Sequence, residues 1–208
     1  MAIDAGRRDG IILMEFGLFI QQMGAVRHFK TETYTHRGQS CKIYRDAGDA
    51  EGKAKAVAAK LAVRTVIDKG FDLPVDLRFY CTNNYAVQNR AFNRDAGWNN
   101  VSWITLGTTA LQNGRADALS AVITPGHTKG SITCIHEIGH CLHAHARGDD
   151  FFDPTANLVG GPVNAGLVSG YAGMNRKEFV AEVFAGMMVG RQWPGVVIQE
   201  YMAYGGPH

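Results

Sequence analysis

Two periodicities of hydrophobic residues run along this chain. Residues 74–82, PVDLRFYCT, alternate polar and apolar side chains with the period of two that predicts a strand. Residues 49–69 repeat apolar side chains at helical spacing and end before Gly70, where a C-cap glycine belongs, so they predict a long helix. A second and strongly apolar helix is predicted over about 130–146, ended by Arg147-Gly148.

Turn and cap signals divide the rest of the chain. The segments RHFKTETYT and SCKIYRD flank HRGQ, which predicts a β-hairpin with Gly38 in its turn, and residues 1–48 as a whole are predicted to be β-rich. Asn175 can cap a final helix over 176–190. The other predicted elements are strands at 101–107 and 120–124, a helical segment at 194–204, and loops at 83–100 and 148–172.

Composition narrows the class of protein. The 208 residues, 46% hydrophobic and 19% charged, suit one globular domain, in which 1–48 is either an integral part or a small appendage. The net charge of +2 comes without a basic stripe, so no nucleic-acid partner is predicted, and no apolar run is long enough to span a membrane. The apolar run at 10–20 predicts a buried strand rather than a signal peptide, because Glu15 interrupts it and no small-residue cleavage site follows.

The cysteines are predicted to be reduced and mostly buried thiols. They are too few and too scattered for a disulfide framework, and they form no CxxC pair that would indicate a zinc site: Cys41, Cys81, Cys134 and Cys141.

The apolar helix over 130–146 contains CIHEIGHCLH, in which His136 and His140 are four residues apart and therefore share one helix face. Two imidazoles so placed can occupy two corners of a tetrahedral zinc site. Glu137 is rotated by about 100° from His136, where it flanks the ion and can take a proton from a water there. The alternative is a buried helix with hydrogen-bonded histidines, but burying these groups unpaired costs several kcal/mol, which favours a metal site.

A third ligand must come from another segment. The extension that supplies a third histidine in metzincins is missing, since position 143 is His and position 146 is Ala. His143 is too far along the helix from His136 to share one ion, so a core or supporting role is expected, and His145 points to the opposite face. The sequence leaves open whether His127 or His143 contributes to the site.

Two carboxylates, Glu178 and Glu182, share one face of the otherwise apolar helix over 176–190. Three small residues border that face: Ala181, Ala185 and Gly186. They would let this helix approach another closely, and two buried acids require a cation nearby. A simpler alternative makes Glu178 the third residue of a capping box begun by Asn175, but it leaves Glu182 unexplained.

The segment YAGMNRKEFVAEVFA resembles the segment after the HExxH helix in anthrax lethal factor-like zinc peptidases and the related Pro-Pro endopeptidases. Four residues match that pattern in order and spacing: Tyr171, Glu178, Phe179 and Glu182. The resemblance covers about residues 131–188. It implies that Glu178 is the third zinc ligand, that Tyr171 donates its hydroxyl to the developing oxyanion, and that Glu182 orients a ligand.

The resemblance further implies an α+β, zincin-like metallopeptidase fold of the gluzincin type over residues 49–208, with a small mixed sheet and an active-site helix. The expected activity is zinc-dependent hydrolysis of peptide bonds in a protein substrate. The strand at 101–107 is expected to be a sheet edge against which an extended peptide pairs.

Two other functions fit the HExxH sequence less well. A deformylase-like zinc hydrolase is disfavoured because the motifs that accompany HExxH in deformylases are missing. A catalytically inactive zinc-binding module is disfavoured because neither Glu137 nor Tyr171 is needed merely to hold an ion. The resemblance suggests a bacterial toxin or effector domain delivered into a target cell, with a cognate immunity or inhibitor protein as a second partner; the alternative is a cytoplasmic housekeeping peptidase.

Overall fold

The computed structural model describes residues 29–46, 50–81, 90–92, 102–107, 110, 126–151 and 161–208. Its described part is mixed α+β, as the sequence predicts, with one five-stranded mixed sheet in the order β1-β2-β3-β5-β4. The strands are β1 (Phe29–His36), β2 (Gln39–Asp46), β3 (Arg78–Cys81), β4 (Arg90–Phe92) and β5 (Trp103–Leu106). The helices are α2 (Ala50–Asp68), α4 (Lys129–Arg147), α6 (Arg176–Met188) and α7 (Gly195–Ala203), with short 3₁₀ turns η1 (Gly148–Phe151) and η2 (Ala165–Leu167).

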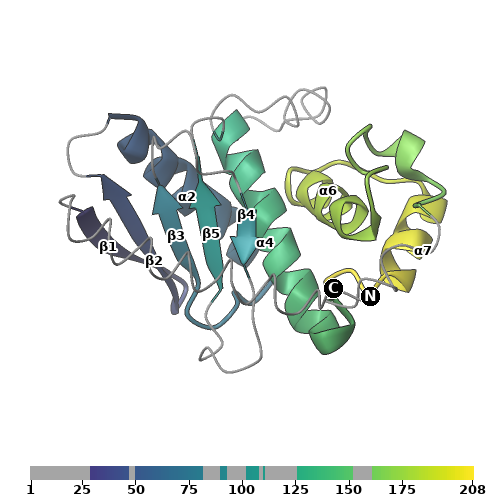
Figure 1. Ribbon diagram of the computed structural model, residues 1–208, viewed down its shortest axis with the longest axis horizontal. Coiled ribbons are helices and arrows are strands. Elements are labelled where there is room, and N and C mark those ends of the chain that lie inside the picture. Colours follow the sequence, from purple (N-terminus) through teal and green to yellow (C-terminus); the bar gives the residue numbers. More distant parts are fainter. Residues whose placement is uncertain are drawn as a thin grey trace, which may run out of the picture.

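Helix α4 occupies the middle of the molecule. The sheet and α2 lie on one side of it, and α6 with α7 lies on the other (Figure 1). Of its nineteen residues, the thirteen that are buried include the whole stretch from Gly130 to Gly139. A helix enclosed in this way must be apolar nearly all round, which explains the composition that the sequence shows there.

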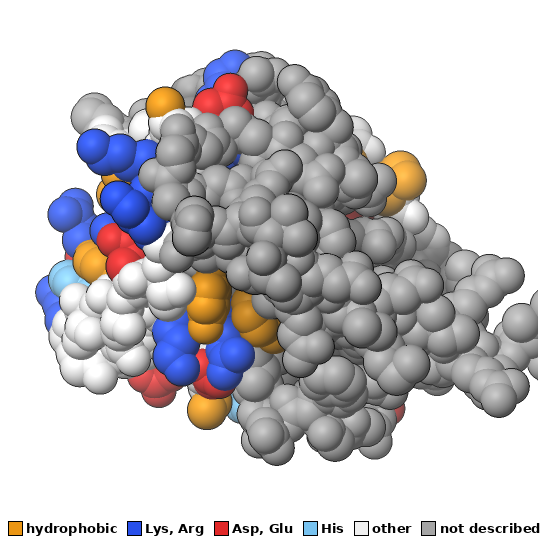
Figure 2. Space-filling view, turned by 60° about the vertical axis from the view of Figure 1, so that its left-hand side comes forward, with side chains coloured by type: hydrophobic (Ala, Val, Ile, Leu, Met, Phe, Trp, Pro, Cys, Tyr) orange, Lys and Arg blue, Asp and Glu red, His pale blue; other side chains and the backbone are white. Residues whose placement is uncertain are grey.

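The predicted hairpin is confirmed. Strands β1 and β2 pair antiparallel from Phe29↔Asp46 to His36↔Gln39, and the two residues between them are Arg37 and Gly38. Both have positive φ, 47° and 82°, the backbone that a tight two-residue hairpin turn requires and that glycine adopts at no steric cost. On the described part of the surface seen in Figure 2, charged side chains of both signs are visible.

Strands β2, β3 and β5 are parallel and form the centre of the sheet. A row of three fully buried side chains crosses them in register: Ile43, Phe79 and Ile104. Helix α2, predicted at 49–69 and found at Ala50–Asp68, connects β2 to β3 and packs its buried alanines and valines on the sheet. A parallel pair needs a crossover of this kind, so the long predicted helix and the parallel sheet depend on each other.

The four cysteines are free and buried, as predicted. Burial raises the pKa of the Cys41 and Cys81 thiols to about 12, so both stay protonated. In the part of the chain that the structure describes, none of the helices combines the length and the apolar character that crossing a bilayer demands.

One sequence prediction about the sheet is wrong. The strand predicted at 101–107 is found as β5, but it is not an edge, because β4 pairs with it antiparallel, Ala91 opposite Ile104. Strand β4 has three residues and lies inside the segment predicted to be a loop, 83–100. A strand this short carries no detectable period of hydrophobic residues. The strands predicted at 10–20 and 120–124 lie outside the described residues.

Helix α4 begins with a reciprocal cap: the Thr128 side chain accepts from the Ser131 amide, and the Ser131 side chain accepts from the Thr128 amide. Gly148, with φ of 56°, ends the helix as predicted. Helix α6 runs from Arg176 to Met188, two residues shorter at its C-terminus than the predicted 176–190, and its N-cap is Asn175 as predicted.

Helices α4 and α6 cross with almost no space between them at Gly139. A Cβ at that position would lie 2.9 Å from Cδ1 of Phe184 and 3.4 Å from Cα of Ala181. Ala181 therefore faces the other helix, as its small side chain suggests. Gly186 does not: a Cβ there would clash with the indole of Trp193, whose Nε1 donates to the Val183 carbonyl at 2.9 Å.

We expect Gly139→Val to destabilise the protein by about 1–3 kcal/mol, the usual cost of overfilling a packed interface. Gly166→Val is the matched control, because a Cβ at position 166 meets no atom within 4 Å, and its effect should stay within about 0.5 kcal/mol. Urea unfolding of both variants measures the difference. Equal losses would contradict the close approach of the two helices.

Candidate metal centre

The two histidines of the HExxH sequence project from one face of α4 toward α6. Their ring centroids are 4.7 Å apart and their planes are nearly perpendicular. Glu178, in the first turn of α6, faces both: its Oε2 lies 3.1 Å from Nε2 of His136 and 3.3 Å from Nε2 of His140. The structure thus brings together the three residues that the sequence and the resemblance nominate as metal ligands.

The geometry of these three atoms suits a metal ion. Each residue offers one ligand atom, and the three atoms lie within 4.8 Å of one another. Ligand atoms about 2.1 Å from a tetrahedral zinc ion stand about 3.4 Å apart, close to the separations from Glu178 to the two imidazoles. Two imidazoles and a carboxylate are also the ligand set of known catalytic zinc sites. The donor set therefore fits zinc, with a further coordination position open to water.

The charges of the cluster favour a cation at this place. Burial disfavours the charged form of His136, but its contacts with Glu178 and Glu182 outweigh burial and raise its pKa to about 9. Burial likewise disfavours ionised Glu178, yet hydrogen bonds from His136 and His140 hold its pKa well below the usual range. The carboxylates thus stabilise positive charge between the two helices.

Glu182 lies behind His136, on the side away from the other ligands. Its Oε1 is 2.9 Å from Nδ1 of His136, and both side chains are 1% exposed. A carboxylate at this place can hold the imidazole with Nε2 directed at the ion. Nothing in the spacing of the sequence alone requires this contact; the match to the lethal factor-like pattern nominated it.

The two interpretations of Glu178, as a residue of the helix cap and as a metal ligand, are compatible. The amide of Glu178 donates to Oδ1 of Asn175 at 3.0 Å, as expected for the third residue after an N-cap. Its carboxylate, in contrast, turns toward the histidines. The backbone of Glu178 is capped while its side chain remains a candidate ligand.

The two residues with proposed chemical roles lie close to the cluster. Glu137 follows His136 on α4 and is 2% exposed. Tyr171 lies in the turn before α6, is 37% exposed, and has its ring centroid 6.1 Å from that of His136. One group is thus buried beside the candidate ligands, and the other is accessible to solvent.

The remaining histidines of α4 are separate from the cluster. His143 is 3% exposed, its Nε2 donates to the Tyr204 carbonyl at 2.8 Å, and its ring packs edge-on against Phe151. It therefore anchors the chain after α7 and is a core residue. His145 is exposed. His127 and His143 are not members of the group of candidate ligands.

Sequence reasoning missed two residues that hold the segment before α6. The Ser169 hydroxyl donates to Oε2 of Glu182 at 2.8 Å. Glu200 on α7 accepts from the amides of Val163 and Asn164 at 2.7 and 2.8 Å. Both contacts join residues that the fold alone brings together, and serine or glutamate in a loop or helix gives no signal of such a partner.

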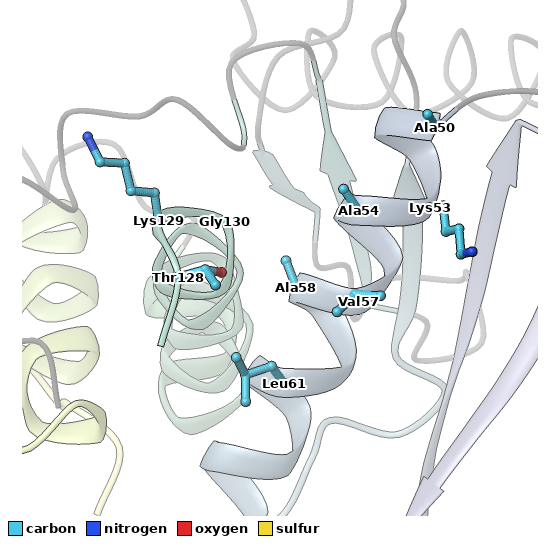
Figure 3. Close-up of a pocket in the computed structure, with 9 residues that line it drawn as sticks. All are labelled: Ala50, Lys53, Ala54, Val57, Ala58, Leu61, Thr128, Lys129 and Gly130. Atoms are coloured by element: carbon cyan, nitrogen blue, oxygen red, sulfur yellow. The ribbon is translucent and has the colours of Figure 1, made fainter. Parts of the chain in front are cut away.

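A pocket between α2 and the start of α4 lies apart from this cluster (Figure 3). Its lining residues are Ala50, Lys53, Ala54, Val57, Ala58, Leu61, Thr128, Lys129 and Gly130. They include no carboxylate, imidazole or thiol, which are the groups that metal binding and acid–base catalysis use most. We therefore assign the candidate site to the His136 cluster.

Comparison of the chain with protein-family models, with curated proteins and with solved structures gives no match. The residues of the cluster and their geometry therefore carry the functional assignment proposed below.

Burial lowers the pKa of His143 to about 4, from 6.5. Between these values the unfolded chain binds a proton that the folded chain does not, so stability falls as pH drops from about 6.5 to 4. The full loss from this group is roughly 3 kcal/mol. Urea unfolding at several pH values should show a shallower dependence for His143→Gln than for wild type. If the stabilities of wild type and His143→Gln changed equally with pH, His143 would not be the group responsible for the pH dependence.

We expect the metal-free chain to take up one zinc ion, with stabilisation of about 2.7 kcal/mol at a free zinc concentration 100 times Kd. Losing a residue that only supports a ligand typically weakens metal binding about 10–100-fold. Glu178→Gln replaces a candidate ligand itself, so it should weaken zinc binding by more than that. Asp150→Asn is the matched control, since that carboxylate is 80% exposed at the far end of α4. Calorimetric titration measures all three proteins, and equal affinities would refute the site.

Proposed function

We propose that this protein is a zinc-dependent endopeptidase with a zincin-like fold. The observation that carries the proposal is the convergence of two imidazole nitrogens from α4 and one carboxylate oxygen from α6, at 3.1 and 3.3 Å. These are the nitrogens of His136 and His140 and the oxygen of Glu178. An HExxH helix paired with a glutamate from a following helix is the ligand arrangement that the resemblance implies.

The arrangement of elements supports the finer description of the fold. The candidate ligand helix α4 packs on a small mixed sheet whose outermost strand on the α4 side, β4, is antiparallel to its neighbour. The helix with the third ligand follows α4 and crosses it at Gly139. The likeness to lethal factor-like peptidases covers about residues 131–188, which are the residues that build this crossing.

A zinc ion, when bound, would supply Lewis acidity toward water and toward the substrate carbonyl. The Glu137 carboxylate takes a proton from the attacking water and later delivers it to the leaving amine. The Tyr171 hydroxyl donates a hydrogen bond to the oxygen that gains negative charge as the carbonyl is attacked. Glu182 keeps the His136 ring in place throughout.

The sheet offers a place for an extended peptide. Among the described strands, β4 has one paired neighbour, β5, and its other edge is not paired with any of them. Strand β4 also contacts α4, so the strand lies beside the candidate ligand helix. We propose that substrate pairs with the backbone of β4, which replaces the sequence expectation that 101–107 is the edge. Main-chain pairing provides affinity with little demand on substrate sequence.

The same resemblance supports a bacterial toxin or effector as the biological role, with a host or competitor protein as substrate. An inhibitor that covers the metal cluster and the β4 edge would then be the second partner.

We expect Glu137→Gln to lower the peptidase rate by roughly 10²–10⁴-fold, because the amide cannot accept and return the proton. Zinc content should not change, since Glu137 is not among the three candidate ligands. New peptide termini in a protein mixture, counted after adding wild type or variant, provide the measurement. A fully active Glu137→Gln variant would contradict the proposed mechanism. A zinc-loaded wild type that cleaves no protein would favour a non-catalytic binding module.

A further inference from the structure

We propose that Ser169 is a positioning residue that couples metal occupancy to the turn that carries Tyr171. The inference rests on the proposed zinc peptidase function and goes beyond it, because neither the HExxH sequence nor the resemblance assigns Ser169 a role. A series of short polar contacts links the backbone of this turn to a candidate metal ligand.

The Ser169 hydroxyl is held from both sides. Its oxygen accepts from the amide of Ala172 at 3.1 Å and lies 2.8 Å from Oε2 of Glu182. The amide can only donate, so the hydroxyl accepts there and has its proton free for Glu182, whose ionised carboxylate can only accept. The direction of both bonds follows from these chemical limits.

The other oxygen of Glu182 passes this orientation to the metal ligand. Oε1 lies 2.9 Å from Nδ1 of His136, and the two side chains are 1% exposed, so water does not compete. With Oε2 engaged by Ser169, the carboxylate presents Oε1 to the ring and favours the proton on Nδ1. The lone pair is then on Nε2, which faces Glu178 and His140 at the candidate metal position.

The same hydroxyl fixes the turn around Tyr171. Tyr171 lies between Ser169 and Ala172 in the sequence. The hydrogen bond from the Ala172 amide to the Ser169 hydroxyl closes the turn around it. The Ser169 amide donates to the Ala165 carbonyl at 3.0 Å, and the Tyr171 carbonyl accepts from the Met174 amide at 3.1 Å. The position of the Tyr171 ring, 6.1 Å from that of His136, and the orientation of His136 therefore depend on one side chain.

A purely structural role for Ser169 makes a different prediction, and the chain offers a matched control for it. Glu200 also holds the segment before α6, through the amides of Val163 and Asn164 and the Asn164 side chain. Neither Glu200 nor these partners is among the residues that contact His136. Glu200→Gln should loosen the segment without changing the orientation of the metal ligand.

The test compares zinc affinity in wild type, Ser169→Ala, Ser169→Thr and Glu200→Gln, by competition with a chelating dye. Ser169→Ala should bind zinc about tenfold more weakly, at the lower end of the effect of losing a residue that supports a ligand. Ser169→Thr keeps the hydroxyl and should restore most of the affinity. Glu200→Gln should lose thermal stability and keep its zinc affinity. In cleavage assays, Ser169→Ala should lower kcat more than it changes KM.

Amide hydrogen exchange tests the coupling without an activity assay. The first comparison, with and without zinc, uses the wild type alone. Zinc should slow exchange at the Ala172 amide in wild type and leave it unchanged in Ser169→Ala. Suppose that the wild type binds zinc and cleaves substrate. If zinc then has no effect on exchange at the Ala172 amide, or if Ser169→Ala keeps the wild-type zinc affinity, the positioning role alone is overturned. A wild type that takes up no zinc overturns the proposed function as well.

Discussion

The candidate site depends on the close crossing of α4 and α6. At Gly139 the two helices are so near that a single added carbon would meet Phe184 and the backbone of Ala181. This distance lets a carboxylate in the first turn of α6 reach both imidazoles of α4. A larger residue at the crossing would push the helices apart and lengthen the contacts between Glu178 and the two histidines. Close packing of the two helices and the contacts of Glu178 with the histidines therefore both require a very small residue at position 139.

Polar contacts, in addition to the core packing of Ala165, Val168 and Ala172, hold the segment that leads into α6. Asn175 caps the helix, Ser169 joins the segment to Glu182, and Glu200 ties it to α7. Several large apolar side chains of this segment are exposed, among them Val163 and Met174. Directional bonds fix orientation more narrowly than non-directional apolar contact does, which suits the role proposed for Tyr171 in this segment.

The sequence predicted the helices, and the residues that come together in the candidate site, better than it predicted the sheet. Cap residues, as at Asn175 and Gly148, set helix ends within a residue or two, and the spacing of His136 and His140 places them on one face whatever the fold. Strand β4 was missed because three residues carry no period, and its pairing partner is set by tertiary structure. Ser169 was missed for the same reason, since its bond to Glu182 spans thirteen residues and has no local signature.

The position of Glu178 within α6 has an electrostatic consequence. As the third residue after the Asn175 cap, its carboxylate lies at the positive end of the helix dipole, which favours the ionised form that a metal ligand requires. The same partial positive charge disfavours a cation nearby. Glu182, one turn further on and fully buried, adds a second negative charge beside His136. The two carboxylates of α6, together with the buried Glu137 carboxylate beside His136 on α4, can balance a divalent ion.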